Sequence, residues 1–291
     1  MNKNMKIIVT GVKGQLGYDV CRELKERGYT NYLGIDIDDL DLTNEQAVKK
    51  FISEHKPNVV INNAAWTAVD KAEEYPDKVY EVNALAVKYL ANACKDNDAT
   101  LIQISTDYVF KGDGDKYYVE SDTKGALGVY GKTKSQGEDF VIDTLEKYFI
   151  VRISWVFGIN GNNFVKTMLR LAESKNHLNV VCDQIGSPTY TYDLSKLLCD
   201  MIESKKYGIY HATNEGVCSW YDFTNYIFEV ANISSVQVDP ITTEEYQKSV
   251  KQAFRPLNSR MSKDKLVENG FNRLPHWKDA VKKFIKDELG R

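Results

Sequence analysis

A glycine-rich turn near the N-terminus links a short apolar run to an amphipathic segment. Residues 6–10 predict a β-strand, and residues 16–28 predict a helix with a periodic apolar face. The turn carries Gly11, Gly14 and Gly17 in a G-x-x-G-x-x-G pattern, which differs from the usual G-x-G-x-x-G fingerprint. Glycine allows a tight turn and lets backbone N–H groups and the helix N-terminus face a pyrophosphate. The turn therefore predicts a dinucleotide site, with a purely structural turn as the alternative.

The first half of the chain alternates apolar, β-rich runs with helical patterns. Strands are expected at residues 6–10, 32–36, 58–62, 100–105 and 149–154. Helices are expected at residues 16–28, 76–95 and 132–144, and a further helix is expected to be capped by Thr43, with Gln46 completing a capping box. Continuous Ile/Val strands that alternate with helices indicate a parallel sheet covered on both faces, a Rossmann-type doubly wound α/β fold. Ligands bind beyond the carboxyl ends of such strands.

The pattern changes after about residue 158. Helices are expected at residues 163–174, 193–203, 220–230 and 276–289, with a short strand at 207–211. We expect a dinucleotide-binding Rossmann domain over residues 1–158, to which part of 180–215 returns. Residues 159–291 are expected to form mainly a smaller α/β substrate-binding domain that closes over the strand ends.

Composition and charge exclude several classes of protein. The 291 residues include 38 Lys and Arg against 41 Asp and Glu, so the net charge of −3 gives no electrostatic footprint for nucleic acid or a membrane surface. No apolar run approaches the roughly 18 residues that span a bilayer, and the N-terminus does not resemble a signal peptide, so a cytoplasmic protein is expected. The five cysteines form no C-x-x-C pair, which argues against a disulfide framework or a zinc site, and we expect no bound metal.

Polar and small residues follow the second and third expected strands. Asp36 ends the second strand, where a carboxylate can accept hydrogen bonds from a ribose 2′-hydroxyl and favour NAD over NADP. No Arg lies near it to hold a 2′-phosphate, and a helix cap or solvated turn is the alternative. Asp41 follows and can flank the adenine or cap the next helix. Ala64 and Ala65 are small enough for a cofactor to lie against the backbone, and tight helix–sheet packing can hold at the same time.

Tyr130 and Lys134 form a Tyr-x-x-x-Lys pair, a spacing that puts both side chains on one helix face. A free tyrosine has a pKa of about 10 and is a poor acid–base group at neutral pH. A cation about 4 Å away, at an effective dielectric of about 20, supplies about 4 kcal/mol, enough to lower that pKa by up to about three units. Lys134 is therefore expected to poise Tyr130 for proton transfer to or from a carbonyl or alcohol. A surface pair is the alternative.

Hydroxyl side chains end the fourth expected strand at the same edge of the sheet. A hydroxyl there can hydrogen-bond the substrate oxygen that Tyr130 protonates. Thr106 is the expected residue, and Ser105 is expected to touch the cofactor side. Capping of the strand end is the alternative for both.

Longer motifs lie along almost the whole chain. They are A-A-W-T-A-V-D-K-A-E at 64–73, T-D-Y-V-F at 106–110, S-W-V-F-G at 154–158, D-Q-I-G-S-P-T at 183–189 and R-P-L-N-S at 255–259. Together with the glycine turn and the Tyr–Lys pair, they make the chain similar to the extended short-chain dehydrogenase/reductases. Within that superfamily the chain resembles the dTDP-4-dehydrorhamnose reductases.

The resemblance implies a reaction and a set of site residues. The family reduces the C4 ketone of dTDP-4-dehydro-L-rhamnose with NADPH or NADH, giving dTDP-L-rhamnose for surface polysaccharide. It implies that Tyr130 is the catalytic acid, Lys134 its partner and Thr106 a hydrogen-bonding group for the reacting oxygen. Cofactor contacts are implied for Gly11, Gly14, Gln15, Leu16, Asp36, Asp41, Leu42, Ala64, Ala65, Trp66, Tyr130 and Lys134. Substrate contacts are implied for Thr106, Asp107, Trp155 and Asn163.

Two comparisons within the resemblance bear on the reaction. Related nucleotide-sugar 4,6-dehydratases carry Thr-Asp-Glu because they need a further acid and base to eliminate water, whereas Tyr108 follows Thr106 and Asp107 here. The resemblance thus favours simple reduction. Trp66 departs from the Tyr or His usual in the family, and this affects how the cofactor is expected to pack. The carboxylates that bind metal at the dimer interface of some members have no match.

Other functions stay open at this stage. The chain could reduce another 4-keto-6-deoxy sugar nucleotide, or it could be a non-catalytic, dinucleotide-binding regulatory subunit. The expected partner is a dTDP-sugar, with no nucleic acid and no membrane, and the chain is expected to be a monomer or homodimer.

Overall fold

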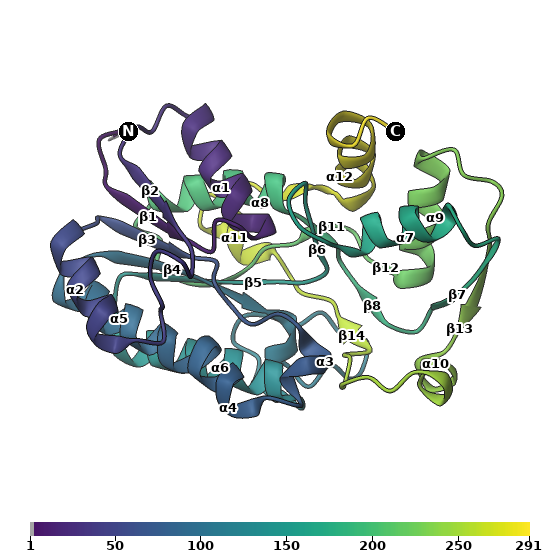
Figure 1. Ribbon diagram of the computed structural model, residues 1–291, viewed down its shortest axis with the longest axis horizontal. Helices are drawn as coiled ribbons and strands as arrows, with labels where there is room; N and C mark the ends of the chain where they lie inside the picture. Colours follow the sequence, from purple (N-terminus) through teal and green to yellow (C-terminus); the bar gives the residue numbers. More distant parts are fainter. Residues whose placement is uncertain (1–2) are drawn as a thin grey trace.

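The structure, a computed structural model, describes residues 3–291. Its central element is a parallel sheet of six strands in the order β10-β5-β4-β3-β1-β2 (Figure 1). The strands are β1 (Ile7–Thr10), β2 (Tyr32–Ile35), β3 (Val59–Asn62), β4 (Thr100–Thr106), β5 (Tyr148–Ile153) and β10 (Gly208–His211). The chain adds β2 on one side of β1 and β3 on the other, a reversal that opens a ligand crevice at the carboxyl ends of a doubly wound sheet. The expected fold class is confirmed.

Helices cover both faces of this sheet (Figure 1). One face carries α1 (Gln15–Glu26) and α8 (Thr191–Ile202), and the other carries α2 (Glu45–His55), α5 (Ala86–Asp96) and α6 (Val129–Thr144). Alternate residues of β1 serve the two cores, because successive side chains of a strand point to opposite faces. Ile7 and Val9 pack with α1 and α8, whereas Ile8 packs with α2, α5 and α6. Burial on both faces explains why this strand is an uninterrupted apolar run.

The start of α2 differs from the expectation. Thr43 does not cap this helix, because its backbone N–H and its hydroxyl both donate to Asp41 Oδ1, at 2.9 and 2.7 Å. The cap is instead Asn44, whose Oδ1 accepts a hydrogen bond from the backbone N–H of Ala47 at 3.1 Å. Asx-type bonding by Asp41 thus moves the cap by one residue.

The long helix expected at residues 76–95 is also divided. It consists of α4 (Pro76–Tyr80), a π-helical turn (Glu81–Leu85) and α5. Such turns occur frequently at functional sites. In this chain the π-helical turn carries Asn83, a buried amide whose contacts are described below. Farther along the chain, α6 begins at Val129, earlier than expected, and so includes Tyr130.

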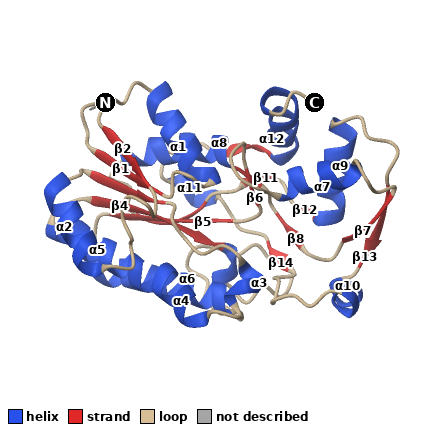
Figure 2. Cartoon of the chain, in the orientation of Figure 1, coloured by secondary structure: helices blue, strands red, loops and turns tan. Residues whose placement is uncertain are grey.

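Most of the remaining elements form a second unit (Figure 2), which has its own apolar core. Its principal helices are α7 (Phe164–Ala172), α9 (Trp220–Val230) and α12 (Trp277–Lys283), the last continued by a π-helical turn (Phe284–Glu288). Short strands accompany them: β6 (Val156–Phe157), β7 (His177–Val181), β8 (Ile185–Gly186), β9 (Thr189–Tyr190), β11 (Asn214–Glu215), β12 (Cys218–Ser219), β13 (Gln237–Ile241), β14 (Asn258–Ser259) and β15 (Leu274–His276). Among the shorter helices, α10 (Thr243–Ser249) follows β13. By contrast, α3 (Val69–Ala72) and a 3-10 turn (Asp107–Val109) contact α6, and α11 (Asp264–Glu268) contacts β10. Although α8 and β10 come late in the sequence, they complete the large sheet and its cover.

Candidate active site

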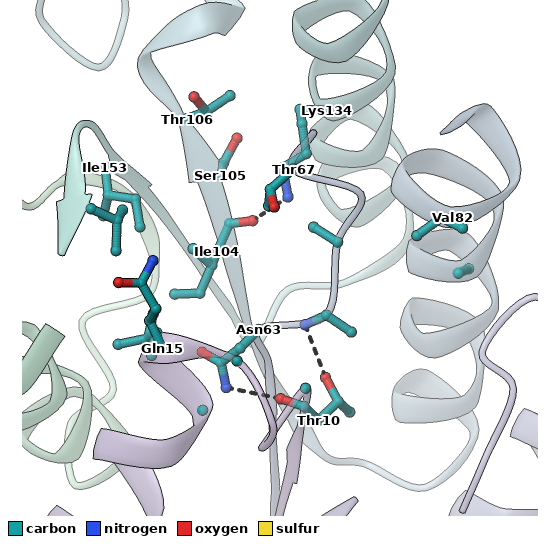
Figure 3. Close-up of a pocket in the computed structure, with 18 of the residues that line it drawn as sticks. Thr10, Gln15, Asn63, Thr67, Val82, Ile104, Ser105, Thr106, Lys134 and Ile153 are labelled. Carbon is teal, nitrogen blue, oxygen red and sulfur yellow. Dashed lines mark hydrogen bonds between the residues drawn. The ribbon is translucent and has the colours of Figure 1, made fainter. Parts of the chain in front are cut away.

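A cavity of about 680 Å³ runs along the carboxyl ends of the central strands (Figure 3). Most of the expected site residues lie in its wall: Gly11, Gly14, Gln15, Leu16, Asp36, Asp41, Leu42, Ala64, Ala65, Thr106, Asp107, Tyr130, Lys134 and Trp155. Trp66 and Asn163 are absent from this wall. The volume lies within the range of small-molecule and cofactor sites, which is about 300–1,000 Å³.

Glycine is required at two places where β1 leads into α1, one in the turn and one in the first turn of the helix. Gly11 has φ +68°, a conformation that side chains disfavour, and a Cβ there would lie 2.9 Å from the backbone nitrogen of Ala64. A Cβ on Gly17 would overlap the carbonyl oxygen of Gly11. The turn therefore packs directly on the backbone after β3, and α1 begins immediately after Gly14 with its N-terminus at the cavity.

A row of buried polar side chains crosses the sheet below the cavity. The Thr10 hydroxyl donates to Asn62 Oδ1 at 2.6 Å, and the Asn62 amide donates to Gln103 Oε1 at 2.8 Å. The Asn63 amide donates to the Thr10 carbonyl at 3.1 Å, as the dashed line in Figure 3 shows. The buried Asn63 Oδ1 has no hydrogen-bond partner among residues 3–291. Since Asn63 lines the cavity, this oxygen is available to accept a hydrogen bond from a ligand.

Asp36 ties the end of β2 to the glycine turn. Its Oδ2 accepts a hydrogen bond from the backbone N–H of Lys13 at 2.9 Å, and its Oδ1 accepts one from Ile37 at the same distance. The exposed Lys13 ammonium pairs with Asp38 and also lines the cavity. Lys13 was not among the expected site residues, although its position directly before Gly14 was a usable signal. The cavity thus has both a carboxylate and a cation at this rim.

Tyr130 and Lys134 lie on α6 at the far end of the cavity, beside the end of β4. The Lys134 ammonium is buried and donates to the Ile104 carbonyl at 2.6 Å (Figure 3). Burial lowers the pKa of this ammonium to about 8, against a weaker opposing effect of the Glu138 carboxylate. The expected lowering of the tyrosine pKa is wrong for this structure. Burial raises the pKa of Tyr130 to about 12, although its contact with the Thr106 hydroxyl acts in the opposite direction.

Asp107 follows β4 and is fully enclosed. Its Oδ1 accepts a hydrogen bond from the Thr106 hydroxyl at 3.0 Å, and its Oδ2 accepts one from the Ser259 hydroxyl. Burial raises the pKa of the carboxyl to about 6, and these hydrogen bonds lower it in part. Asp107 thereby fixes the orientation of Thr106, the hydroxyl expected to meet the substrate.

Trp66 and Asn163 lie next to the cavity but do not line it. The indole N–H of Trp66 donates to the Ala68 carbonyl at 3.1 Å, which turns the ring along its own segment. The Asn163 amide donates to Gln15 Oε1 at 3.0 Å, so it contacts a wall residue without being one. Asn83, which the sequence analysis missed, holds the Trp66 backbone by bonds of 2.8 and 3.1 Å. Asn83 lies in the π-helical turn, and nothing in the sequence pattern predicts that turn.

A second cavity of about 360 Å³ adjoins the first. Tyr108, Trp155 and Trp220 line both cavities and so form their common wall. The two indole rings stack with centroids 3.7 Å apart and planes inclined by 14°. Trp155 has φ +50°, a strained conformation for a bulky residue of the kind that is found at functional sites. Sequence reasoning pointed to Trp155 and gave no sign of Trp220.

Unpaired donors line the second cavity. Arg255 binds Asp70 through one guanidinium nitrogen at 2.7 Å, while its buried Nη1 has no hydrogen-bond partner within residues 3–291. The buried amide nitrogen of Gln252 is likewise without a partner in that range. Both residues belong to the cavity wall. Unsatisfied buried donors of this kind fit an anionic ligand, because a charge-assisted hydrogen bond would remove their desolvation cost.

Between residues 3 and 291, no group of three or more His, Cys, Asp or Glu side chains is placed to hold a metal ion. All five cysteines carry free thiols. Each helix in that range is too short or too polar to span a membrane.

Comparisons with known proteins agree with this geometry. The family described as "RmlD substrate binding domain" matches residues 5–289. A protein named dTDP-4-dehydrorhamnose reductase from Aggregatibacter actinomycetemcomitans is 42% identical over 289 residues, covering 95% of this chain and 97% of the relative.

Two solved structures are similar over nearly the whole chain. A dTDP-4-dehydrorhamnose reductase from Clostridium acetobutylicum is 44% identical, with a TM-score of 0.94 over 99% of this chain and 100% of that one. The reductase of that name from Bacillus anthracis, solved in complex with NADP, is 41% identical, with a TM-score of 0.91 over 97% of this chain and 99% of that one.

Proposed function

Because the chain belongs to the RmlD substrate binding domain family, we propose that it uses NADPH or NADH to reduce the C4 ketone of dTDP-4-dehydro-L-rhamnose to the alcohol of dTDP-L-rhamnose. One observation carries the proposal. A single cavity has the glycine turn in its wall together with Tyr130, Lys134 and Thr106. A dinucleotide and a proton donor can therefore meet one substrate there.

The residues of the first cavity fit a nicotinamide dinucleotide. The turn at Gly11 offers a side-chain-free surface and the start of α1 offers a helix N-terminus, as a pyrophosphate requires. Asp36 and the unpartnered Asn63 Oδ1 offer acceptors for hydroxyl or amino groups. When bound, the cofactor supplies a hydride for the carbon of the ketone.

Tyr130 supplies the proton in this proposal. A pKa of about 12 keeps its phenol protonated at neutral pH, which suits an acid in the direction of reduction. As hydride reaches C4, the phenol gives its proton to the ketone oxygen, so that hydride and proton together convert the carbonyl into the alcohol. For Thr106 to donate to the same oxygen, its one hydroxyl proton must turn away from Asp107 Oδ1, to which it donates in this structure. The Lys134 ammonium offsets the negative charge left on Tyr130.

The second cavity is proposed to hold the dTDP part of the substrate. Its unpaired donors on Arg255 and Gln252 suit a diphosphate, and Trp155 and Trp220 offer flat apolar surfaces beside the reacting sugar. Most of its wall comes from residues beyond 158. We therefore assign substrate binding mainly to residues 159–291, with α8 and β10 belonging to the dinucleotide-binding part.

The neighbourhood of Tyr130 favours reduction over dehydration. The Tyr108 ring lies edge-on to the Tyr130 ring, with centroids 5.3 Å apart and planes at 80°. It occupies the place after Asp107 where the dehydratases described above carry Glu. Elimination of water would need that further carboxylate, whereas hydride delivery does not.

The test is direct. The purified chain is incubated with dTDP-4-dehydro-L-rhamnose and NADPH or NADH, nicotinamide absorbance is followed, and the product is analysed by NMR. Oxidation of the cofactor with formation of dTDP-L-rhamnose supports the proposal. Formation of the C4 epimer would keep the chemistry and change the substrate pose. Cofactor binding without oxidation would point to another 4-keto-6-deoxy sugar nucleotide or to a non-catalytic role.

A further inference from the structure

Three successive residues at the end of β4 meet three successive turns of one face of α6. The pairs are Ile104 with Lys134, Ser105 with Glu138, and Thr106 with Tyr130. The proposed chemistry uses the first and third pairs and leaves the middle one unexplained. In that pair the Ser105 hydroxyl donates to Glu138 Oε1 at 2.6 Å. Because residues four apart share a helix face, Glu138 fixes this face at the turn that follows Lys134.

Glu138 is a fully buried carboxylate with a complete set of partners. Arg152 of β5 donates to both of its oxygens, at 2.9 and 2.8 Å, in a two-pronged ion pair. Lys124, in the loop before α6, lies 3.6 Å from Glu138 Oε2. Ser105 and Arg152 are also direct neighbours in register across β4 and β5. Both strands are thereby joined to one carboxylate of the catalytic helix.

Three other titratable residues lie around the Glu138–Arg152 pair. His211 of β10 lies 3.4 Å from Arg152, and burial lowers its pKa to about 3, so it is neutral at physiological pH. The Glu120 carbonyl accepts a hydrogen bond from Arg152, and its carboxylate accepts one from the His211 backbone N–H. Asp139, next to Glu138 on α6, is exposed and pairs with Lys124. Glu138 is thus the carboxylate on the buried side of α6 one turn from Lys134, and it pairs directly with Arg152 and Lys124.

We propose that Glu138 is a positioning residue for proton transfer, which holds the end of β4 against α6 through Ser105 and offsets the charge of the buried Lys134 ammonium. A buried ammonium keeps its proton only where an opposite charge or hydrogen bonds replace lost hydration. Lys134 has the Ile104 carbonyl as its hydrogen-bond acceptor and Glu138 as its countercharge. The catalytic consequence rests on the proposed function, whereas the charge coupling can be measured without it.

The coupling is tested by NMR titration of lysine ¹⁵Nζ in the full chain, with the Lys134 signal assigned by its loss in Lys134→Met. In Glu138→Gln the apparent pKa of Lys134 is expected to fall by about one unit or more, a loss of at least about tenfold in proton affinity. Asp139→Asn is the matched control, because it makes the same charge change one residue away on the exposed face. It is expected to leave the Lys134 signal unchanged. An unchanged Lys134 pKa in folded Glu138→Gln would overturn the proposal.

Catalysis gives a second readout. In Glu138→Gln the basic limb of the pH profile of kcat/KM is expected to move to lower pH by a similar amount, with activity recovering as the pH falls. A purely structural role would instead lower kcat/KM at every pH without moving the limb, which would contradict the proposal. If wild-type enzyme turns over no 4-keto sugar nucleotide, the proposed function fails while the titration still tests Glu138.

Glu138→Gln leaves the buried Arg152 unpaired and can unfold the chain. The double variant Glu138→Met/Arg152→Met avoids this, because apolar replacement of a buried ion pair is often tolerated. It also removes the Arg152 cation, so it is compared with Arg152→Met, which keeps the Glu138 carboxylate, and the Lys134 pKa is expected to be lower in the double variant. Equal Lys134 pKa values in the two folded variants would reject the charge-offsetting role.

Discussion

Ser259 donates a hydrogen bond to the Asp107 carboxylate across 152 positions of the sequence. Asp107 directly follows β4 of the central sheet, and Ser259 belongs to β14, which pairs with β8 in the second unit. The same carboxylate orients Thr106. This end of the cavity is therefore assembled from both units, and the carboxylate that orients Thr106 is itself held by a contact between them.

Replacing Lys134 by Met should remove the cation that is proposed to offset the charge of ionised Tyr130. The phenol then gives up its proton less readily, so kcat/KM is expected to fall by about 10²-fold or more. Any residual activity should peak at a higher pH than in the wild type. Steady-state pH profiles measure both effects. A fully active variant with an unshifted profile would remove Lys134 from the mechanism.

Asp36 and Lys13 should act in opposite senses on the cofactor's 2′ group. Asp36 leads us to expect that NADH serves at least as well as NADPH. Replacing Lys13 by Ala should weaken NADPH binding several-fold and leave NADH binding nearly unchanged, because only NADPH carries a 2′-phosphate. Fluorescence titration with each cofactor measures this. Lys111→Ala is the matched control, since that exposed lysine also pairs with an aspartate but lies outside the cavity. Equal losses for both cofactors in Lys13→Ala would contradict the assignment.

Arg255 should contribute to binding of the sugar nucleotide. Replacing it by Gln removes a charged donor to the diphosphate, worth about 1.5–3 kcal/mol, so KM for the sugar nucleotide should rise by about tenfold or more. The dissociation constant of NADPH should stay the same. Arg273→Gln, at an arginine paired outside both cavities, should change neither quantity. A weaker NADPH complex with unchanged KM in Arg255→Gln would place the arginine elsewhere in the reaction.

Asp19 should make stability depend on pH. It is buried on α1, one of its oxygens lacks a hydrogen-bond partner within residues 3–291, and burial raises its pKa from 3.8 to about 6. The folded state thus binds the proton more tightly than the unfolded state. Its ionisation costs stability as the pH rises from about 4 to 6, by up to about 3 kcal/mol above that range.

The variant Asp19→Asn removes this cost. Its free energy of unfolding should exceed that of the wild type by about 1–3 kcal/mol at pH 7.5 and by less at pH 5, because the wild-type carboxyl is largely protonated there. Urea denaturation at both pH values measures the difference. Asp96→Asn, at an exposed helix position, should show no such pH dependence. An identical difference at both pH values would mean that the charge of Asp19 is not the cause.

Local pattern was sufficient to predict the large sheet and most of the residues that line the first cavity. The apolar runs marked the strands, and the glycine turn marked one end of the cavity. The spacing of Tyr130 and Lys134 fixed the other end, because i and i+4 share a helix face whatever surrounds them. The wrong prediction, a lowered pKa for Tyr130, concerned a property that depends on the tertiary environment. The pKa of Tyr130 is set mainly by its burial, which no spacing reveals.

Long-range contacts explain the other omissions. Arg255 meets Asp70 across 185 positions, and Trp220 reaches the cavity wall from the start of a helix in the second unit. The N-cap of α2 is Asn44 and not the expected Thr43, because Thr43 donates its hydrogen bonds to Asp41. The capping-box pattern does not include this local alternative. Contacts of this kind can be identified only from the folded structure.

The measurement that tests the central claim most directly compares Tyr130→Phe with the wild type in one assay. Single-turnover oxidation of NADPH by dTDP-4-dehydro-L-rhamnose is followed by absorbance, cofactor affinity by fluorescence, and the product by NMR. The account predicts that Tyr130→Phe binds NADPH as the wild type does but forms dTDP-L-rhamnose about 10²–10⁴ times more slowly. A variant that reduces the ketone at the wild-type rate would show that the proton comes from another group.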